Sequence, residues 1–253
     1  MKIKKKYWKL RRKILKTLIP EIIWPRFIKL DSVPIKIRNT PYSFGTKRAI
    51  IKGNYELSER KLIENLSLKG EIIFEMGGSI GILTSILSHK IGNNGSIFSI
   101  EADDRLVNYS KVWLESLKNV KVISGFAFPV YKIDNIIINE FDKDGGSLGG
   151  KVKFETSVHN LTTNSKRYRI FDLKRMEEFS ELTPSVLVID IEGSETIMLD
   201  IKPKFPVSIK WIMIELHPTI YGEYTKKKII ESIKEENFFL FNNKSNNFLF
   251  RRS

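Results

Sequence analysis

Short apolar runs alternate with longer amphipathic stretches over most of this chain, and this pattern predicts its fold. The apolar runs predict five strands, at residues 71–75, 96–100, 120–124, 185–189 and 209–215. The stretches around and between them predict helices at residues 57–68, 80–91, 104–117 and 172–182, one from Ser194, and one at 226–236. Strands that alternate with helices form a parallel sheet with helices on both faces.

Two further apolar runs end the pattern, at residues 238–241 and 247–250, and Asn-Lys-Ser-Asn joins them. A connection of this kind predicts an antiparallel hairpin. The expected fold class is therefore α/β, with a doubly wound, seven-stranded, mostly parallel Rossmann-like sheet and an antiparallel C-terminal hairpin. The sheet of class I methyltransferases ends in this way, whereas nicotinamide-binding sheets usually continue in parallel.

Two segments depart from the alternation. Residues 22–46 contain three prolines and only short alternating runs, so we expect an irregular arm with at most one strand there. Between residues 129 and about 170, strand-like runs at 136–138 and 152–156 flank a stretch rich in glycine and acids, which predicts an antiparallel insertion. This insertion is either a substrate lid or a tolerated surface excursion.

The net charge of +14 divides the chain into two parts. Residues 1–52 hold sixteen lysines and arginines against two acids, whereas the remainder holds 27 residues of each sign. We therefore separate an arm at 1–52 from a domain at 53–253 that carries the insertion. Apolar residues recur every three or four positions up to Pro20, which predicts a basic amphipathic helix over residues 1–19. Its apolar stripe comprises Ile3, Tyr7, Leu10, Ile14 and Leu18.

This predicted helix has three interpretations: it packs on its own domain or a second copy, binds an anionic membrane surface, or binds nucleic acid. Nucleic acid is disfavoured because the domain beyond the arm is neutral, whereas such binders usually line their cleft with basic residues. No apolar run reaches the roughly twenty residues that span a bilayer. The absence of cysteine fits a reducing compartment. We expect a cytoplasmic protein, and we leave open both the choice between peripheral membrane attachment and packing of residues 1–19 and the oligomeric state.

The most specific motif follows the first predicted strand, in the sequence Glu-Met-Gly-Gly-Ser-Ile-Gly at residues 75–81. Gly77 and Gly78 allow the backbone to turn sharply and to approach a ligand, and the next helix presents free N–H groups and its positive dipole end. The following strand leads to Glu101, whose carboxylate can accept hydrogen bonds from both hydroxyls of a ribose. This arrangement predicts a site for an adenosine derivative.

The acid two residues before the first glycine indicates which derivative binds. The dinucleotide fingerprint is G-x-G-x-x-G, whereas this loop reads E-x-G-G-x-x-G. Glu75 would repel a pyrophosphate but helps to hold the ammonium of an amino acid, and S-adenosylmethionine carries both an ammonium and a carboxylate. We expect this cofactor rather than NAD. The alternative, a glycine turn that only packs a helix on the sheet, does not account for Glu75 and Glu101 together.

A second polar cluster follows the fourth predicted strand, in the sequence Asp-Ile-Glu-Gly-Ser-Glu at residues 190–195, and the fifth strand leads to Glu-Leu-His at 215–217. Three carboxylates in six residues beside a buried strand are costly unless they are bound or used. Asp190 and Glu192 alternate along an extended backbone and can face the same side. A plainer interpretation is that Glu192 and Glu195 cap the next helix.

These motifs resemble those of the FkbM-type S-adenosylmethionine-dependent methyltransferases, in E-M-G-G-S-I-G, I-D-I-E-G-S-E and I-M-I-E-L-H-P, over about residues 53–241. The resemblance implies O-methylation of a hydroxyl on a sugar, glycan or related small-molecule or lipid-linked acceptor. It also implies that Glu75, Gly77 and Gly81 surround the amino-acid end of the cofactor and that Glu101 binds its ribose, while Ser79 stands where Asn is frequent. Our candidates for cofactor binding are Glu75, Gly77, Gly78, Ser79, Gly81, Glu101, Ala102 and Phe126.

The candidates for catalysis are Asp190, Glu192, Glu215 and His217, and the resemblance adds Glu195 to the acidic motif. An aliphatic hydroxyl must lose its proton for methyl transfer, and His217 or Asp190 can act as the base. In a second mechanism, Asp190 and Glu215 bind Mg²⁺ together with the acceptor. A histidine at a strand end can also be a structural, hydrogen-bonded residue.

Two functions lie outside this interpretation. A nucleic-acid (RNA) methyltransferase would use the basic arm, but methylation of base nitrogens normally uses Asn or Asp followed by Pro-Pro and an aromatic residue, where this chain has Asp-Ile-Glu-Gly. A non-catalytic module that binds the cofactor or a membrane would not need both an intact glycine loop and an intact acidic cluster.

Overall fold

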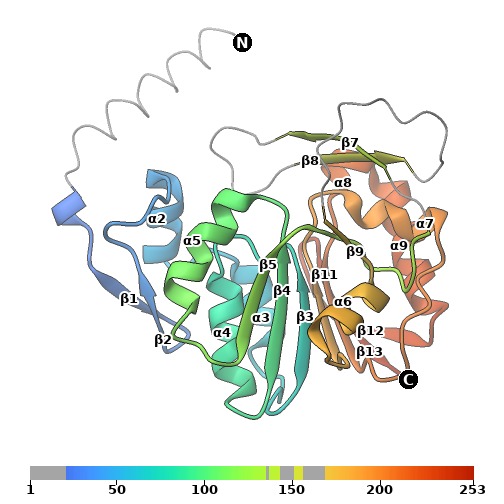
Figure 1. The fold of residues 1–253 in the computed structure, drawn as a ribbon, viewed down its shortest axis with the longest axis horizontal. Helices are drawn as coiled ribbons and strands as arrows, with labels where there is room; N and C mark the ends of the chain where they lie inside the picture. Colours follow the sequence, from blue (N-terminus) through green and yellow to red (C-terminus); the bar gives the residue numbers. More distant parts are fainter. Residues whose placement is uncertain (1–20, 135–136, 143–150, 156–168) are drawn as a thin grey trace, which may run out of the picture. The chain divides into compact units, whose positions relative to one another are not determined.

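The computed structural model describes residues 21–134, 137–142, 151–155 and 169–253, which are coloured in Figure 1. The predicted basic helix at residues 1–19 and most of the predicted glycine-rich loop lie outside these residues. The chain divides into two compact units, with the boundary after Leu57. Among the helices of the described ranges, none has both the length and the apolar character needed to cross a membrane.

The described part of the first unit is more regular than the sequence predicted. It holds a short 3-10 helix, η1, and an antiparallel hairpin, where at most one strand was expected. The hairpin forms because Asp31 and Ser32 both have positive φ, of 48° and 70°, as a two-residue hairpin turn requires. The elements are η1 (Glu21–Ile23), β1 (Phe27–Leu30), β2 (Val33–Lys36) and helix α2 (Phe44–Ile51).

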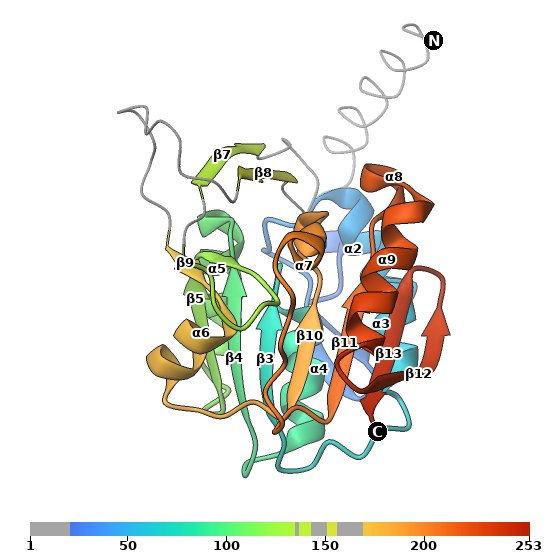
Figure 2. The same cartoon turned by 90° about the vertical axis from the view of Figure 1, so that its right-hand side faces the viewer.

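The second unit contains the predicted seven-stranded sheet, in the order β12-β13-β11-β10-β3-β4-β5 (Figures 1 and 2). Five neighbouring strands are parallel, and β13 is antiparallel to both β11 and β12. The predicted fold class and the closing hairpin are thus confirmed. The strands are β3 (Ile72–Met76), β4 (Ser96–Glu101), β5 (Val120–Ser124), β10 (Val186–Ile189), β11 (Trp211–Glu215), β12 (Phe238–Lys244) and β13 (Asn247–Arg252).

Helices cover both faces of this sheet: in Figure 2, α4 lies behind it, whereas α6 and α9 lie in front. The helix expected from Ser194 is only a 3-10 turn and one short α-helical segment. A further short helix, α8, was not predicted. The helices are α3 (Leu57–Ile63), α4 (Ile82–Ile91), α5 (Asp104–Leu114), α6 (Leu173–Ser180), η2 (Ser194–Thr196), α7 (Ile197–Asp200), α8 (Pro218–Tyr221) and α9 (Glu223–Lys234).

The insertion after β5 contains the predicted antiparallel pair, β7 (Ile137–Asp142) and β8 (Lys151–Glu155). Its two ends are joined by a short parallel ladder that the sequence analysis missed, between β6 (Phe126–Ala127) and β9 (Ile170–Phe171). The N–H of Phe126 donates to the carbonyl of Arg169 at 2.8 Å within this ladder. The insertion therefore leaves and rejoins the domain at neighbouring points.

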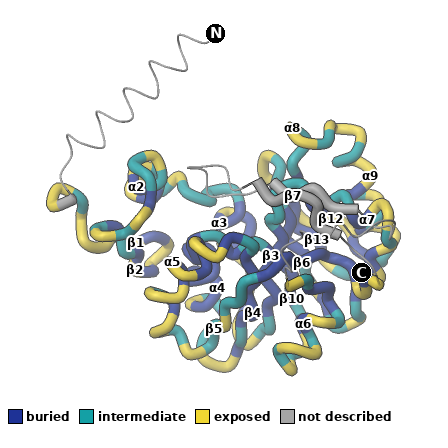
Figure 3. The backbone as a smooth tube through the Cα atoms, turned by 45° about the horizontal axis from the view of Figure 1, so that its top comes forward, coloured by how far each residue is buried: buried dark blue, intermediate teal, exposed yellow. Residues whose placement is uncertain are grey.

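The central strands are buried on both faces, as the dark blue segments of Figure 3 show. All four residues of β10 and the last four of β3 are buried, in agreement with a parallel sheet covered on both sides. Polar side chains can then emerge only where the strands end. Both motifs singled out from the sequence lie at the carboxyl ends of these strands.

Candidate active site

The glycine turn connects β3 with α4, and its backbone packs closely against two neighbouring strands. The N–H of Gly77 donates to the carbonyl of Ile100, in β4, at 2.8 Å. Gly77 has a φ of +89°, and a Cβ there would lie 1.7 Å from the carbonyl oxygen of Asp190. A Cβ at Gly78 would lie 2.2 Å from Ser99 Oγ. Both positions therefore require glycine because the neighbouring strands leave no room for a side chain.

Glu101 ends β4 beside this turn and binds to it. Its Oε2 accepts a hydrogen bond from the N–H of Ser79 and its Oε1 accepts one from the N–H of Asp103, both at 2.8 Å. Burial raises the pKa of Glu101 to about 7, although the two backbone donors act in the opposite direction. Each carboxylate oxygen keeps a further lone pair, which a ribose hydroxyl can use. The residue predicted to bind ribose thus lies against the glycine turn.

Glu75 accepts hydrogen bonds that the sequence did not predict. It lies within β3, its side chain is buried, and its Oε2 accepts hydrogen bonds from Thr84 Oγ1 at 2.7 Å and Ser99 Oγ at 2.5 Å. Burial raises the pKa of Glu75, and the two hydroxyl donors partly offset this increase. Since Thr84 belongs to α4 and Ser99 to β4, the carboxylate connects the helix to the sheet. Its predicted contact with an ammonium group stays a prediction.

The remaining cofactor candidates surround the start of α4. Gly81 is the N-cap residue of this helix, has a φ of +76° and provides no side-chain cap for the first N–H groups. A helix start of this kind suits a carboxylate ligand. Ala102 is partly buried against the hydrophobic core, and Phe126 is a core residue that is 3% exposed. Contacts of these two residues with a cofactor stay predictions.

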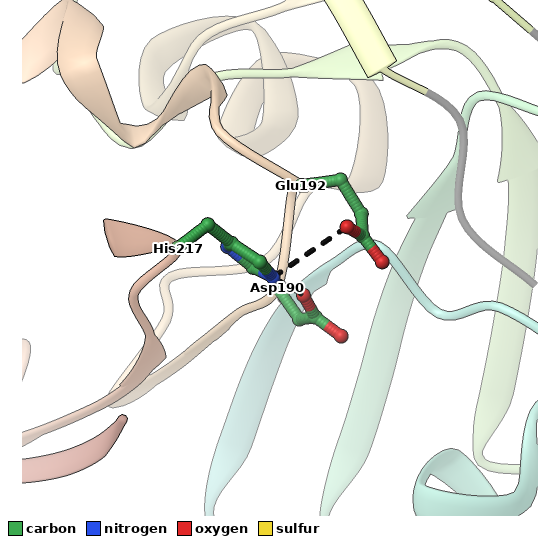
Figure 4. Close-up of side chains that lie close together, drawn as sticks. All are labelled: Asp190, Glu192 and His217. Atoms are coloured by element: carbon green, nitrogen blue, oxygen red, sulfur yellow. Dashed lines mark ion pairs between the residues drawn. The ribbon is translucent and has the colours of Figure 1, made fainter. Parts of the chain in front are cut away.

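The acidic motif and His217 come together at the ends of β10 and β11 (Figure 4). Nε2 of His217 lies 3.5 Å from Asp190 Oδ1 and 3.6 Å from Glu192 Oε2. On the other side of the ring, Nδ1 lies 3.1 Å from Oε1 of Glu195, which is fully buried. The same Glu195 oxygen accepts a hydrogen bond from the N–H of Gly193, so Glu195 also caps the η2 turn as the plainer interpretation expected.

The surroundings of His217 favour a positive charge on its ring. Burial opposes that charge, but the hydrogen bond with Glu195 and the charges of Glu195, Glu192 and Glu215 outweigh it, so the pKa of His217 is raised. The backbone N–H of His217 donates to the hydroxyl of Tyr221 at 2.6 Å. Contacts at both the ring and the backbone N–H therefore hold His217 in place.

The surroundings of Glu215 favour its protonated form. Burial, followed by a hydrogen bond with Glu59 of α3, raises the pKa of Glu215 to about 7. Two carboxyl groups that share a hydrogen bond must hold a proton between them. Among the described residues, the group of His and acidic side chains that could hold an ion is Asp190, Glu192 and His217. The expected ligand pair of Asp190 and Glu215 stays a prediction.

Sequence reasoning missed several residues that shape the site. Thr84 and Ser99, which hold Glu75, interrupt apolar runs, and a polar residue inside a buried pattern could have drawn attention to them. Glu195 was assigned to the acidic motif, but its pairing with His217 was not foreseen. Glu59 lies in a helix with no distinctive pattern, so the sequence carries no signal for its contact with Glu215.

The strand order, with an antiparallel β13 between β11 and β12, is that of the class I methyltransferase fold. Several solved structures are similar to this chain at low sequence identity. Fibrillarin from Aeropyrum pernix, with natively bound S-adenosyl-L-methionine, is 13% identical over 74% of this chain and 67% of its own, with a TM-score of 0.43. A SAM-dependent methyltransferase from Aquifex aeolicus is 13% identical over 81% of this chain and 94% of its own, with a TM-score of 0.42.

A TehB-like SAM-dependent methyltransferase from Corynebacterium glutamicum is 12% identical over 82% of this chain and 94% of its own, with a TM-score of 0.43. Similarities this low concern the fold and not the activity, so the function has to be argued from the site. No protein-family model and no curated protein sequence matches the chain.

Proposed function

We propose that this chain is an S-adenosylmethionine-dependent methyltransferase. One observation carries the proposal: the carboxylate of Glu101 accepts a hydrogen bond from the N–H of Ser79 in the glycine turn. This turn leads into α4, whose first N–H groups have no side-chain cap. A ribose can bond to Glu101 while the carboxylate of the amino-acid end lies at the start of α4. A single ligand that carries both groups fits this edge of the sheet.

We further propose that the acceptor is a hydroxyl of a sugar, glycan or related small molecule, as in the FkbM-type enzymes that the motifs resemble. The acceptor oxygen would lie at Asp190, Glu192 and His217. The backbone of Asp190 supports this position, because its N–H donates to the carbonyl of Met76, the residue before the glycine turn, at 2.8 Å. An acceptor at this position would lie next to a cofactor bound at the glycine turn.

The proposed reaction is an in-line displacement at a methyl group that the positive sulfur already activates. The protein has to align the acceptor oxygen with this methyl group, and orientation can supply up to about 7 to 11 kcal/mol. It also has to accept the proton that the hydroxyl group loses. The cluster at residues 190–192 and 217 provides two carboxylates and an imidazole for that purpose.

The experiment that tests this function has two stages. Calorimetry of the purified chain with S-adenosylmethionine measures cofactor binding, and a methyl-release assay then compares a glycan, a lipid and an RNA panel. We expect binding, with turnover on hydroxyl acceptors of the first two panels. Turnover confined to RNA would favour the nucleic-acid alternative, and binding without any turnover would favour a non-catalytic module.

Residues 1–19 are proposed to attach the enzyme peripherally to an anionic membrane surface, where each basic residue contributes about 1 kcal/mol. The support is the concentration of basic charge in residues 1–52 while the remainder is neutral. Attachment of this kind would bring the enzyme to a lipid-linked acceptor.

A further inference from the structure

We propose that Asp190, Glu192 and His217 form a binding site for one divalent transition-metal ion. Their donor atoms, one from each residue, all lie within 4.8 Å of one another. Two of these residues follow β10 and the third follows the adjacent strand β11. Figure 4 shows the three side chains pointing toward one another.

The distances within the cluster agree with a metal site. Nε2 of His217 lies 3.5 Å from Asp190 Oδ1 and 3.6 Å from Glu192 Oε2. Around a tetrahedral ion with bonds of about 2.1 Å, the ligand atoms are separated by about 3.4 Å. An ion can therefore be placed among these atoms with only small movements of the side chains.

Glu195 provides an independent observation, because it lies outside the proposed ligand set. A histidine that binds a metal through one ring nitrogen usually donates its other N–H to a carboxylate, which fixes the ring and its tautomer. Here Nδ1 of His217 lies 3.1 Å from Oε1 of the fully buried Glu195. A proton on Nδ1 leaves the lone pair of Nε2 directed at Asp190 and Glu192. The Oε2 atom of Glu195 is buried without a hydrogen-bond partner among the described residues, which adds a negative charge that a cation can offset.

The charges around the ring also favour a cation. Three carboxylates surround the ring: Oε1 of Glu195 lies 3.1 Å from Nδ1, and oxygens of Asp190 and Glu192 lie 3.5 and 3.6 Å from Nε2. Carboxylates held this close to one another repel unless a positive charge lies between them. A proton on the imidazole supplies one positive charge, whereas a divalent ion supplies two.

The donor set indicates the class of metal. Mg²⁺ and Ca²⁺ prefer sites made only of oxygen, whereas an imidazole nitrogen suits Zn²⁺, Fe²⁺, Ni²⁺ and related ions. One nitrogen and two carboxylate oxygens therefore favour a transition-metal ion over the Mg²⁺ expected from the sequence. Three protein ligands also leave at least one coordination position for an oxygen of another molecule.

The role of this ion in catalysis rests on the proposed methyl transfer, although its binding does not. An acceptor hydroxyl bound to the ion loses its proton to water more readily, because the cation stabilises the resulting negative oxygen. An electron pair of that oxygen then forms the new C–O bond while the S–CH₃ bond breaks. The products are the methyl ether and S-adenosylhomocysteine, and no other reactant is needed.

The test measures metal binding without cofactor or acceptor. The full chain is treated with a chelator, freed of it, and titrated with Co²⁺, with visible absorption and calorimetry as the two measurements. We expect one ion per chain. His217→Gln and Glu192→Gln should each weaken binding about tenfold or more, and Glu195→Gln should weaken it about 10- to 100-fold through the orientation of the ring. The control Glu215→Gln, whose carboxyl pairs with Glu59, should change the affinity less than about threefold.

Absence of one-to-one binding, or wild-type affinity in both His217→Gln and Glu192→Gln, would overturn the proposal. Loss of binding in Glu215→Gln with wild-type affinity in Glu192→Gln would overturn this ligand set in favour of Asp190 and Glu215. If circular dichroism shows that His217→Gln does not fold, Glu192→Gln decides the question because its side chain is 37% exposed. Calorimetry with S-adenosylmethionine on the metal-free chain tests the proposed function separately.

Discussion

The two ends of the candidate active site differ in the groups that form them, which are backbone groups at one end and side chains at the other. At the proposed cofactor end, backbone groups determine the shape: Gly77 packs against a carbonyl, and Glu101 is held by two N–H groups. At the proposed acceptor end, side chains determine the shape, and those of Asp190 and Glu192 are each 37% exposed. Side-chain substitutions can therefore modify the proposed acceptor end more easily than the proposed cofactor end, whose shape depends on the backbone.

This difference has a physical cause. A cofactor that is the same in every reaction cycle can be bound by fixed N–H groups, which need no rearrangement to bind it. An acceptor that has to be aligned and deprotonated needs side chains with charge and hydrogen-bonding capacity. The comparison predicts that substitutions at the cofactor end affect stability and binding, whereas those at the acceptor end affect turnover.

The largest effect is expected from Gly77→Ala. The new Cβ would meet the backbone carbonyl of Asp190 at 1.7 Å, and the φ of +89° is unfavourable for alanine. Strain and overpacking should together lower the free energy of unfolding by about 3 kcal/mol or more, and cofactor binding should be lost. Chemical denaturation and calorimetry with S-adenosylmethionine measure the two effects.

The matched control for this variant is Gly53→Ala, because Gly53 also has a positive φ, of 71°, but nothing lies within 4 Å of a Cβ placed there. It should cost about 1 to 2 kcal/mol, the usual cost of that conformation for a residue with a Cβ. Equal stabilities of the two variants would show that the turn has more room than the structure indicates.

Asp190→Asn should affect the other end. We expect turnover to fall about 100-fold or more, because the variant loses a negative charge where the acceptor proton leaves. Cofactor affinity should stay within a few-fold, since the backbone N–H of Asp190, which the substitution retains, donates to the carbonyl of Met76 before the turn. The methyl-release assay and calorimetry measure both quantities, with the exposed Asp200→Asn as control. Full turnover in Asp190→Asn would show that the acidic cluster is structural.

A smaller effect, dependent on pH, is expected at Glu101. Its pKa in the folded chain is raised from 4.5 to about 7, so the folded state retains a proton that the unfolded state loses, and this residue's contribution to stability falls as pH rises from about 4.5 to 7. Cofactor binding should instead strengthen through pH 7, because ribose hydroxyls need the ionised carboxylate as acceptor.

Calorimetry at pH 6, 7 and 8 measures this dependence. Glu101→Gln should bind S-adenosylmethionine about tenfold more weakly at pH 8, which corresponds to the loss of about one charged hydrogen bond. The pH dependence of its binding should be flatter than that of the wild type. An identical pH dependence in both proteins would place the titrating group elsewhere.

The smallest effect on either end is expected from removal of residues 1–19. Cofactor affinity and the unfolding of the remaining chain should be unchanged, because the cofactor motif lies wholly beyond this segment. Cosedimentation with anionic liposomes should be lost, and in the full chain it should fall at high salt, because salt screens the basic charges. Cosedimentation that survives the deletion would refute the membrane role, and an unfolded truncation would favour packing of the apolar stripe.

The sequence by itself determined the sheet and the position of the glycine turn. Its alternating pattern predicted five parallel strands and the closing hairpin, and the structure confirms both. Gly77, Gly78 and Gly81 are neighbours in sequence, so the shape of their turn depends on local backbone conformation, which residue type controls directly. The hairpin at Asp31 and Ser32 was missed because two non-glycine residues adopt positive φ there, which composition does not reveal.

Only the tertiary structure decided which charged side chains meet. Glu215 pairs with Glu59 and His217 with Glu195, and Glu75 turns inward to Thr84 and Ser99. Strand order brought the ends of β10 and β11 together, but the choice among several carboxylates at one edge depends on side-chain direction and on the space left by packing. Neither quantity is encoded in a local pattern, because both result from contacts between segments far apart in the chain.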